Sequence, residues 1–438
     1  MRKYTFRGGV HPDDAKRYTR SLPIVVANCD DEMEFPMRQH IGAECVPCVA
    51  VGDEVFVGQK IGMSDAFVSA PVHSSVSGKV TAIDVRTYAT GRTTVVVIEN
   101  DHEYKIHPDI KPAPHYSELS PEELVALVRE GGITGLGGAG FPTHVKLSPP
   151  KDKQAEYVII NGAECEPYVT ADHRVMLERA DLVLYGIEAE MKILGAKKSF
   201  ICIEDNKKDA IDLFSVATRE NPDIDVVVLK KKYPQGSEKQ LIDACLRRRV
   251  PAGKLPIDVG VVVDNISTAA QIATTLKTGM PLIDRVVTVS GDAVKSPANY
   301  QVRLGTSYKT LFEQSEGFSE DIQKVIAGGP MMGQAQFSLE DPVIKGTSSL
   351  LALGEKSARY FAEGSCLRCG KCVDACPMKL IPMSLCDAIR ARDFDRIEKL
   401  HLSDCMECGA CSYICPARRQ LTQTHRLGKT LVRERGTK

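Results

Sequence analysis

The chain has 438 residues, and its 56 Lys and Arg nearly balance 57 Asp and Glu, so the formal net charge of −1 argues against nucleic acid as a partner. Trp is absent and aromatic residues make up only 6%, so stacking platforms for bases are not expected. The length predicts about three or four domains, and the apolar content of 43% is typical of globular proteins with sizeable cores.

The N-terminus and the cysteines bear on location. The first residues, MRKYTFRGGV, lack the apolar core of a signal peptide, and no stretch approaches the roughly 18 consecutive apolar residues of a transmembrane helix. Of the 15 cysteines, those outside the two runs described below show no disulfide framework, which predicts a reducing cytoplasm. If the protein works at a membrane, we expect partners to hold it there.

The first quarter of the chain predicts an extended lead-in followed by short strands. Residues 1–35 are polar and irregular, whereas residues 36–112 alternate valines with turn residues and include a strong strand at 93–98. The run VGDEVFVGQKIG, an Ala-Pro turn and SGKV resemble a biotinyl/lipoyl-like barrel-sandwich domain. That family carries its cofactor on a hairpin lysine. Because the hairpin at 63–69 has no lysine, we expect a scaffold here.

Residues 113–147 contain a predicted helix and a glycine-rich loop. Ser120-Pro121-Glu-Glu123 is a strong helix start, with a cap, an early proline and acids near the positive end, and the helix runs to about Glu130. The loop GLGGAGFPTHVK at 135–146 has four glycines in its first six residues, which leave backbone N–H groups free to face a phosphate or a flat ring. Lys146 adds a positive charge for an anion. A plain turn is the alternative interpretation.

Strands and helices alternate from about 155 to 285. Apolar runs without alternation occupy 157–160, 200–203, 226–229 and 261–263, and helical patterns occupy about 172–194, 206–219, 236–248 and 267–278. This order predicts a parallel sheet buried on both faces. Ligands of such sheets bind beyond the carboxyl ends of the strands, where this chain has NGAECEP at 161–167 and DNIST at 264–268.

Residues 286–353 predict another small β-rich domain. An apolar run at 286–290 is followed by turns, a short helix near 310–312 and the segment GGPMMG at 328–333. A tight turn is the simplest interpretation of that segment.

Two cysteine runs near the C-terminus carry the clearest chemical signal. Both have the spacing C-x2-C-x2-C-x3-C-P, at 366–377 and at 405–416. This is the bacterial spacing for a pair of [4Fe–4S] clusters, in which the fourth cysteine of each run reaches across to the other cluster. We therefore assign one cluster to Cys366, Cys369, Cys372 and Cys415, and the other to Cys405, Cys408, Cys411 and Cys376.

Structural zinc and disulfides are the alternatives for these cysteines. Zinc needs only four ligands per site and has no use for a crossed fourth cysteine, and disulfides require an oxidising compartment. The spacer between the runs has helical patterns at 382–389 and around 394–400, which predicts a helical ferredoxin-like domain. The basic tail is interpreted as a solvated end, with a docking role as the alternative. Its charged residues are Arg426, Lys429, Arg433, Arg435 and Lys438.

The glycine loop followed by INGAECEP resembles the NADH-binding flavoprotein of respiratory complex I, which has G-R-G-G-A-G-F-P-T-G-L-K and then N-A-D-E-S-E-P. With the barrel-sandwich start and the double-cluster end, the chain from about 5 to 420 resembles the RnfC family, a component of the Rnf ion-translocating electron transport complexes.

The resemblance and the patterns together predict a multidomain α/β protein. The expected parts are a lead-in (1–35), a barrel-sandwich (biotinyl/lipoyl-like) β domain (36–112), a Rossmann-like parallel-sheet FMN/NADH domain (113–285), a small β-grasp (SLBB-like) domain (286–353) and a helical two-cluster ferredoxin-like domain (354–438).

The resemblance also implies the site residues. FMN contacts correspond to Gly135, Gly137, Gly138, Lys146, Asn161, Glu164, Tyr233, Gly236, Asp264, Asn265 and Thr268. Contacts to the nicotinamide nucleotide correspond to Phe141, Glu166 and Glu238. Leu136, Ala163 and Ser237 stand where complex I has Arg, Asp and Glu, so each removes charge near the flavin.

The function implied by the resemblance is that of a peripheral NADH/FMN/iron–sulfur subunit of a ferredoxin:NAD+ oxidoreductase that pumps Na+ or H+. It would lie on the cytoplasmic side of the inner (plasma) membrane, with other Rnf subunits as partners, including the ferredoxin-like iron–sulfur subunit. The implied cofactors are FMN and two [4Fe–4S] clusters, with NAD(H) as substrate. Hydride transfer between nicotinamide and flavin needs no protein nucleophile, so we name no catalytic acid or base. The alternatives are a soluble NADH-linked donor to a reductase and a flavin-free cluster relay or scaffold subunit.

Overall fold

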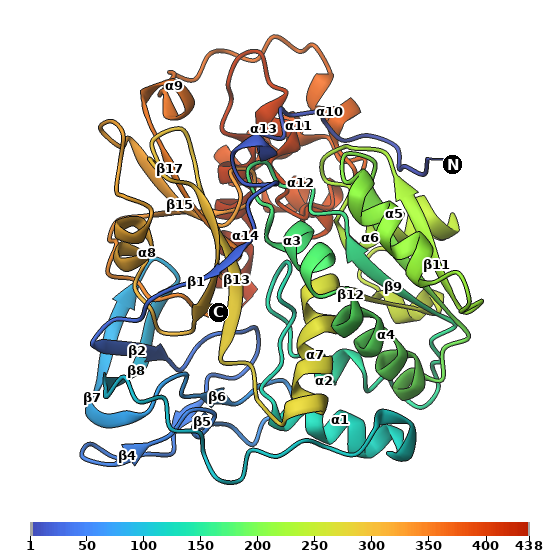
Figure 1. Ribbon diagram of the computed structural model, residues 1–438. Helices are drawn as coiled ribbons and strands as arrows, with labels where there is room; N and C mark the ends of the chain where they lie inside the picture. Colours follow the sequence, from blue (N-terminus) through green and yellow to red (C-terminus); the bar gives the residue numbers. More distant parts are fainter. Residues whose placement is uncertain (1–2, 437–438) are drawn as a thin grey trace.

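The computed structural model describes residues 3–436. One of its units is built on a four-stranded parallel sheet, whose strands β9, β11 and β12 are labelled on the right of Figure 1. Its strand order is β11-β10-β9-β12. The strands are β9 (Tyr157–Gly162), β10 (Lys198–Glu204), β11 (Ile224–Leu229) and β12 (Val261–Asn265). The helices of this domain are α1 (Pro121–Glu130), α2 (Thr143–Lys146), α3 (Ala171–Glu178), α4 (Ala180–Leu194), α5 (Lys208–Ala217), α6 (Glu238–Leu246) and α7 (Ile266–Thr278). The four apolar runs thus form the predicted strands, because side chains on both faces of the sheet pack into apolar cores.

The helix predicted over 172–194 is broken at Arg179. Its backbone leaves the helical region there, with φ −137° and ψ 32°, so that α3 and α4 are separate helices. The Arg179 guanidinium donates a 2.7 Å hydrogen bond to Gln301 of a neighbouring sheet. The break therefore coincides with a contact to another domain. The helical periodicity of residues 172–194 could not predict this break, because it contains no information on that contact.

Residues 32–100 form two antiparallel sheets at the lower edge of Figure 1. One has the order β2-β8-β7-β4, and the other has the order β3-β5-β6. The strands are β2 (Glu32–Pro36), β3 (Val46–Pro47), β4 (Glu54–Val55), β5 (Lys60–Met63), β6 (Val72–His73), β7 (Gly78–Tyr88) and β8 (Gly91–Asn100). Met33, Phe35, Ile61 and Ile98 are fully buried between them, so the two sheets share one core.

A six-stranded mixed sheet with the order β1-β14-β13-β17-β15-β16 forms the third unit. Its elements are β1 (Ile24–Val26), β13 (Asp284–Ser290), β14 (Ala298–Arg303), α8 (Tyr308–Gln314), β15 (Lys324–Ala327), β16 (Gln334–Gln336) and β17 (Ser349–Leu353). Leu311 and Phe312 of α8 pack into the same core as strand residues Val287 and Leu350.

The lead-in predicted for 1–35 is wrong for its second half, because β1 and β2 are strands of two different sheets. Ile24 pairs in parallel with Asn299, and Glu32 pairs with Glu99. These strands of three and five residues are too short to show a clear alternation of apolar and polar residues. They form by pairing with the edges of sheets whose other strands lie far away in the sequence. Before them, the N-terminal segment passes beside the parallel sheet, where Tyr4 bridges to Leu229.

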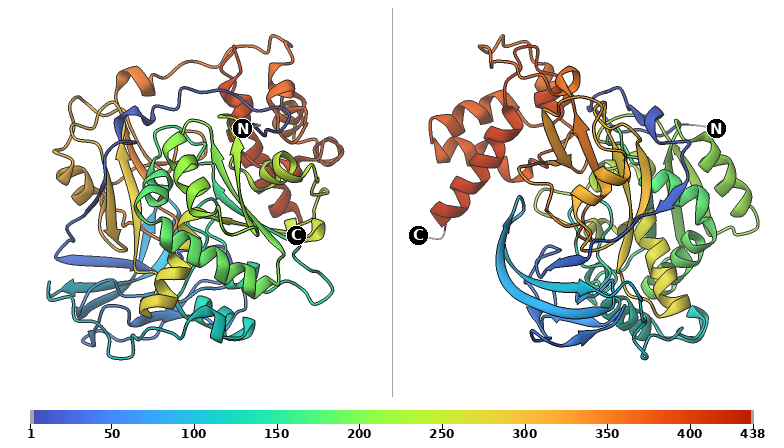
Figure 2. Two further views of the ribbon diagram at one scale, coloured as in Figure 1. Left: turned by 45° about the vertical axis from the view of Figure 1, so that its right-hand side comes forward. Right: turned by 60° about the vertical axis from the view of Figure 1, so that its left-hand side comes forward.

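The C-terminal unit is helical and projects beyond the other units, as Figure 2 (right) shows. Its helices are α9 (Glu355–Ala358), α10 (Lys371–Ala375), α11 (Pro382–Arg390), α12 (Phe394–Lys399), α13 (Ala410–Tyr413) and α14 (Leu421–Gly436). The basic tail forms α14, in which Arg426, Arg433 and Arg435 are exposed and Lys429 is half-buried, in agreement with a solvated end. Lys438 lies outside the described residues. Gly428 brings α14 so close to α11 that a Cβ there would lie 2.6 Å from Ile389. Within 3–436, no helix combines the length and apolar character needed to cross a bilayer.

Lys345 joins three of these units. Its side chain is fully buried, and Nζ donates hydrogen bonds of 2.6 Å to Pro71 O and 2.7 Å to Gly132 O. Burial lowers the pKa of Lys345 to about 7, and a neutral amine still has the two N–H donors that these carbonyls need.

This lysine predicts a pH dependence of stability. The unfolded chain keeps the Lys345 proton up to its ordinary pKa, whereas the folded chain releases it near pH 7, so stability should rise between pH 7 and pH 9. The gain from this group is about 2 kcal/mol. Thermal unfolding midpoints at both pH values should show a smaller rise in Lys345→Met than in the unchanged chain. Equal rises would contradict the shifted pKa.

Candidate functional site

The parallel sheet reverses its winding between β9 and β12. The chain runs from β9 to β10 to β11 on one side and then returns to place β12 on the other side of β9. Asn161 and Asn265 are register partners at the carboxyl ends of these two strands. In open α/β sheets ligands bind at such a switch point, so this edge is the candidate site.

The glycine loop lies against this edge. Leu136 N–H donates to Thr268 Oγ1 at 2.9 Å, and a Cβ on Gly137 would lie 2.6 Å from Asn265 Nδ2. Gly138 has a φ of +79° and open space where a Cβ would stand. Within the described chain, no hydrogen-bond partner takes the backbone N–H groups of 137–140, and 137–139 are exposed. The loop therefore presents a row of free donors beside the strand ends.

Charged groups lie under this loop. Lys146 Nζ donates to Val263 O at 2.8 Å and lies 3.6 Å from Glu238 Oε1. Asp264 is buried, and burial raises its pKa while Lys146 opposes the shift. Asp264 Oδ2 and both carboxylate oxygens of Glu190 have no hydrogen-bond partner among the residues described. Buried acceptors without donors fit a ligand that carries hydroxyl groups. Sequence reasoning missed Glu190, because it lies on the buried face of an otherwise ordinary helix.

Asn161 and Asn265 tie the surrounding loops to the site. Asn161 Nδ2 donates to Gly236 O at 2.8 Å, and Asn265 Nδ2 donates to Asp172 Oδ2 at 2.8 Å. The Asn265 side chain also caps α7 by accepting from Ser267 N–H at 2.9 Å. The residues predicted from distant segments are therefore brought together at one edge.

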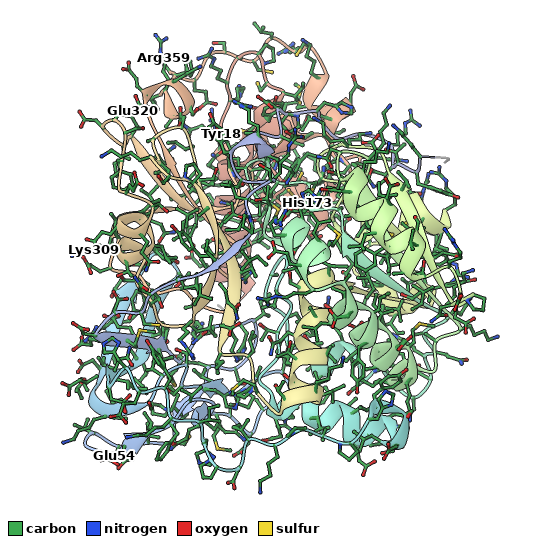
Figure 3. All side chains as sticks on the ribbon, in the orientation of Figure 1. Tyr18, Glu54, His173, Lys309, Glu320 and Arg359 are labelled. Atoms are coloured by element: carbon green, nitrogen blue, oxygen red, sulfur yellow. The ribbon has the colours of Figure 1, made fainter. Side chains whose placement is uncertain are left out.

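Glu164 lies beneath the site. Its carboxylate accepts the Asp172 N–H at 2.7 Å and forms a 3.4 Å ion pair with Lys16, and both side chains are almost fully buried. Burial raises the pKa of Glu164, and Lys16 and Lys207 oppose the shift. The sequence did not predict Lys16 as a site residue, because nothing in the residues around it indicates that this segment packs against the parallel-sheet domain. In Figure 3, Tyr18 and His173 mark where this segment passes the start of α3.

Glu166 faces the other domains. Its carboxylate accepts the N–H groups of Met331 at 3.0 Å and Met332 at 3.1 Å, and the Tyr233 hydroxyl lies 3.4 Å away. Burial raises the pKa of Glu166 to about 7. Tyr233 is itself buried, and its hydroxyl donates to Cys408 O at 2.7 Å. Of the three predicted contacts to the nucleotide, Glu238 lies beside Lys146, and Phe141 lies at the end of the glycine loop. Glu166 has other neighbours, namely Met331, Met332 and Tyr233.

The eight cysteines of the two runs line two cavities. Cys366, Cys369, Cys372 and Cys415 line the first. Cys376, Cys405, Cys408 and Cys411 line the second. Over residues 3–436, no three His, Cys, Asp or Glu side chains converge closely enough to hold a single metal ion. Four thiols around an open cavity fit a cluster of several irons better than one zinc ion.

The two cavities differ in exposure. The first, called the outer cavity, has an exposed Cys369 and the largely exposed Leu367 on its rim. The second, called the inner cavity, has buried Cys408 and Cys411. Its Met378 and Met406 contact Gln240 and Ser237 of the parallel-sheet domain. The inner cavity therefore adjoins the parallel-sheet domain, whereas the outer cavity is lined by residues of the C-terminal unit alone.

Family models match most of the chain. The RnfC barrel sandwich hybrid domain matches residues 4–103, and the Nuo51 FMN-binding domain matches 128–274. The SLBB domain matches 286–335, and the 4Fe-4S dicluster domain matches 365–418. Each model falls on one of the units described above, although the first begins within the segment taken as a lead-in.

Whole-chain relatives agree with these models. The C component of the Na(+)-translocating ferredoxin:NAD(+) oxidoreductase complex of Acetobacterium woodii is 46% identical over 426 residues, covering 97% of this chain and 96% of the relative. The proton-translocating counterpart of Clostridium ljungdahlii is 47% identical over 437 residues, covering 99% and 95%. The C component of the ion-translocating oxidoreductase complex of Vibrio cholerae is 38% identical, covering 92% of this chain and 52% of the relative.

A solved structure shares the fold at lower similarity. A chain of the NAD+-reducing [NiFe]-hydrogenase has a TM-score of 0.50 and 18% identity, covering 72% of this chain and 65% of that chain.

Proposed function

Because the chain belongs to the RnfC family of ion-translocating oxidoreductase complexes, we propose that it is the peripheral NAD(H)-, FMN- and iron–sulfur-containing subunit of a ferredoxin:NAD+ oxidoreductase, on the cytoplasmic side of the membrane. The other subunits of that complex are its partners, among them the ferredoxin-like iron–sulfur subunit. One observation carries the proposal: the inner cysteine cavity adjoins the parallel-sheet domain, and the outer cavity opens to the surface.

The residues at the switch point have the chemistry that FMN requires. When bound, FMN exchanges a hydride with nicotinamide and single electrons with iron–sulfur clusters. The free N–H groups of 137–140 and the Lys146 ammonium would donate to its oxygen atoms. Asp264 Oδ2 and the Glu190 carboxyl oxygens, which have no partner within the described residues, would accept from its hydroxyl groups. Phe141 and Glu238 are partly exposed, and they are the residues that would meet the nicotinamide nucleotide.

The two cavities support the crossed assignment of the cysteines to clusters. Cys376, Cys405, Cys408 and Cys411 would hold the inner cluster, and Cys366, Cys369, Cys372 and Cys415 would hold the outer cluster. Because Cys369 is exposed, the outer site is the one that an electron-transfer partner reaches.

The finer domain assignments belong to the same proposal. The two short sheets of 32–100 support a biotinyl/lipoyl-like barrel sandwich, and the parallel sheet supports a Rossmann-like FMN/NADH domain. The six-stranded sheet with α8 against it supports a β-grasp fold for 286–353.

Anaerobic purification followed by an NADH titration tests the proposal. We expect about eight irons and one FMN per chain, with visible absorbance that NADH bleaches. Eight irons without flavin, and no bleaching, would favour the flavin-free cluster relay. Full activity recovered in the soluble fraction, with no membrane-bound partner, would favour the soluble donor.

A further inference from the structure

Tyr233 joins the parallel-sheet domain to the inner cavity. It follows β11, and its backbone pairs with Val10 of the N-terminal segment through hydrogen bonds of 2.8 and 2.9 Å. Its side chain is 1% exposed, and its hydroxyl donates to the carbonyl oxygen of Cys408 at 2.7 Å. Because Cys408 lines the inner cavity, the phenol holds the backbone of a residue whose thiolate would bind a cluster.

The Glu166 carboxylate lies behind this phenol. Its Oε1 is 3.4 Å from the Tyr233 hydroxyl oxygen, and the N–H groups of Met331 and Met332 hold its two oxygens in place. The same turn also approaches the cluster loop, since a Cβ on Gly409 would lie 2.8 Å from Met331 O. Three units therefore meet at one fixed junction, with a hydroxyl dipole in front of a carboxylate.

We propose that Tyr233 is a positioning residue for the inner iron–sulfur site, whose hydroxyl holds the Cys408 carbonyl and raises the reduction potential of that site, while the Glu166 carboxylate behind it lowers the same potential. The proposal rests on the cluster assignment made above. Hydrogen bonds, net charge and solvent exposure around the ligands set cluster potentials. A donor proton directed at the ligand loop stabilises the added electron, and a nearby negative charge destabilises it.

The outer site has different surroundings. Its rim carries the exposed residues Leu367, Arg368 and Lys371, and water reaches Cys369. The junction therefore affects one potential of the two.

An anaerobic redox titration of the full chain tests this proposal, with dithionite and mediators as reductants and EPR of the two clusters as the readout. In Tyr233→Phe, the reduction equilibrium of one cluster should fall about fivefold, or roughly 40 mV at 59 mV per tenfold change for one electron. In Glu166→Gln at pH 8.5, the same cluster should move to higher potential. Tyr300→Phe removes another buried hydroxyl, which contacts Ser315 at 3.1 Å in the six-stranded sheet, and should move neither cluster.

Opposite shifts in one cluster, with the other unmoved, support the proposal. Loss of about four irons in Tyr233→Phe with the outer cluster retained also supports the positioning role. No shift in either variant, equal shifts of both clusters, or shifts of the same sign in the two variants would overturn it. Dithionite reduces the clusters directly, so the result does not depend on whether FMN binds or NADH is oxidised. A negative result here is therefore distinguishable from a failure of the proposed NADH and FMN function.

Discussion

Replacing Cys415 with alanine is expected to remove the cluster of the first cysteine run, although Cys415 belongs to the second run. Cys415 lines the outer cavity with Cys366, Cys369 and Cys372, so one of the four thiolates of that cluster is lost. Iron should fall from about eight to about four per chain. NADH should still reduce the flavin, because the switch-point site is untouched. Iron analysis and flavin absorbance of the purified variant measure both effects.

Double variants distinguish crossed from uncrossed cysteine sets. Cys369→Ala combined with Cys415→Ala should retain about four irons, because both residues line one cavity, whereas Cys369→Ala combined with Cys376→Ala should lose about eight. If each run held its own cluster, these two results would be exchanged. Cys386→Ala is the matched control, because Cys386 is a buried cysteine of the same domain that lines neither cavity and should keep all the iron.

Replacing Gly137 with valine is expected to weaken flavin binding while leaving both clusters in place. The new side chain begins 2.6 Å from Asn265 Nδ2, so the loop must move away from the strand ends and take its free N–H groups with it. Overpacking of this kind costs about 1–3 kcal/mol, which corresponds to a loss of FMN affinity of roughly 5- to 150-fold. Fluorescence titration of the flavin-depleted chain with FMN measures the affinity, and iron analysis reports whether the cluster domain is intact.

Gly346→Val is the control for this loop change. Gly346 is exposed, lies outside the left-handed backbone region and has no atom within 4 Å of the position of an added Cβ. Its substitution should leave FMN affinity unchanged. If Gly137→Val bound FMN as tightly as the control, the glycine loop would be only a turn, and the flavin site would have to lie elsewhere.

Local patterns were sufficient wherever a segment carries its own signal. The four apolar runs of the parallel sheet become β9 to β12, because strands covered on both faces need no polar positions. The start of α1 was equally readable, since Ser120 and Glu123 form the capping box that their spacing predicts. The spacer helices α11 and α12 also lie where periodicity predicted them.

Contacts between segments far apart in the chain could not be predicted from local sequence patterns. The strands β1 and β2 exist only because distant residues supply their sheet edges, and α4 begins where Arg179 reaches another domain. Buried ionisable residues such as Lys16 and Glu190 resemble surface residues in the sequence, because a polar side chain gives no sign of burial until its neighbours are known.

The chemistry of the protein could be read from its amino-acid order alone, through the cysteine spacing, the glycine loop and the succession of domains. Thiolate spacing and backbone freedom are local properties, so short stretches of sequence express them. Which groups face one another depends instead on the folded chain. In the folded chain, the Tyr233 hydroxyl contacts both Glu166 and the Cys408 carbonyl. Two cysteines of the inner cavity are buried, whereas Cys369 of the outer cavity is exposed. Packing between domains fixes these relations, and no single segment contains the information.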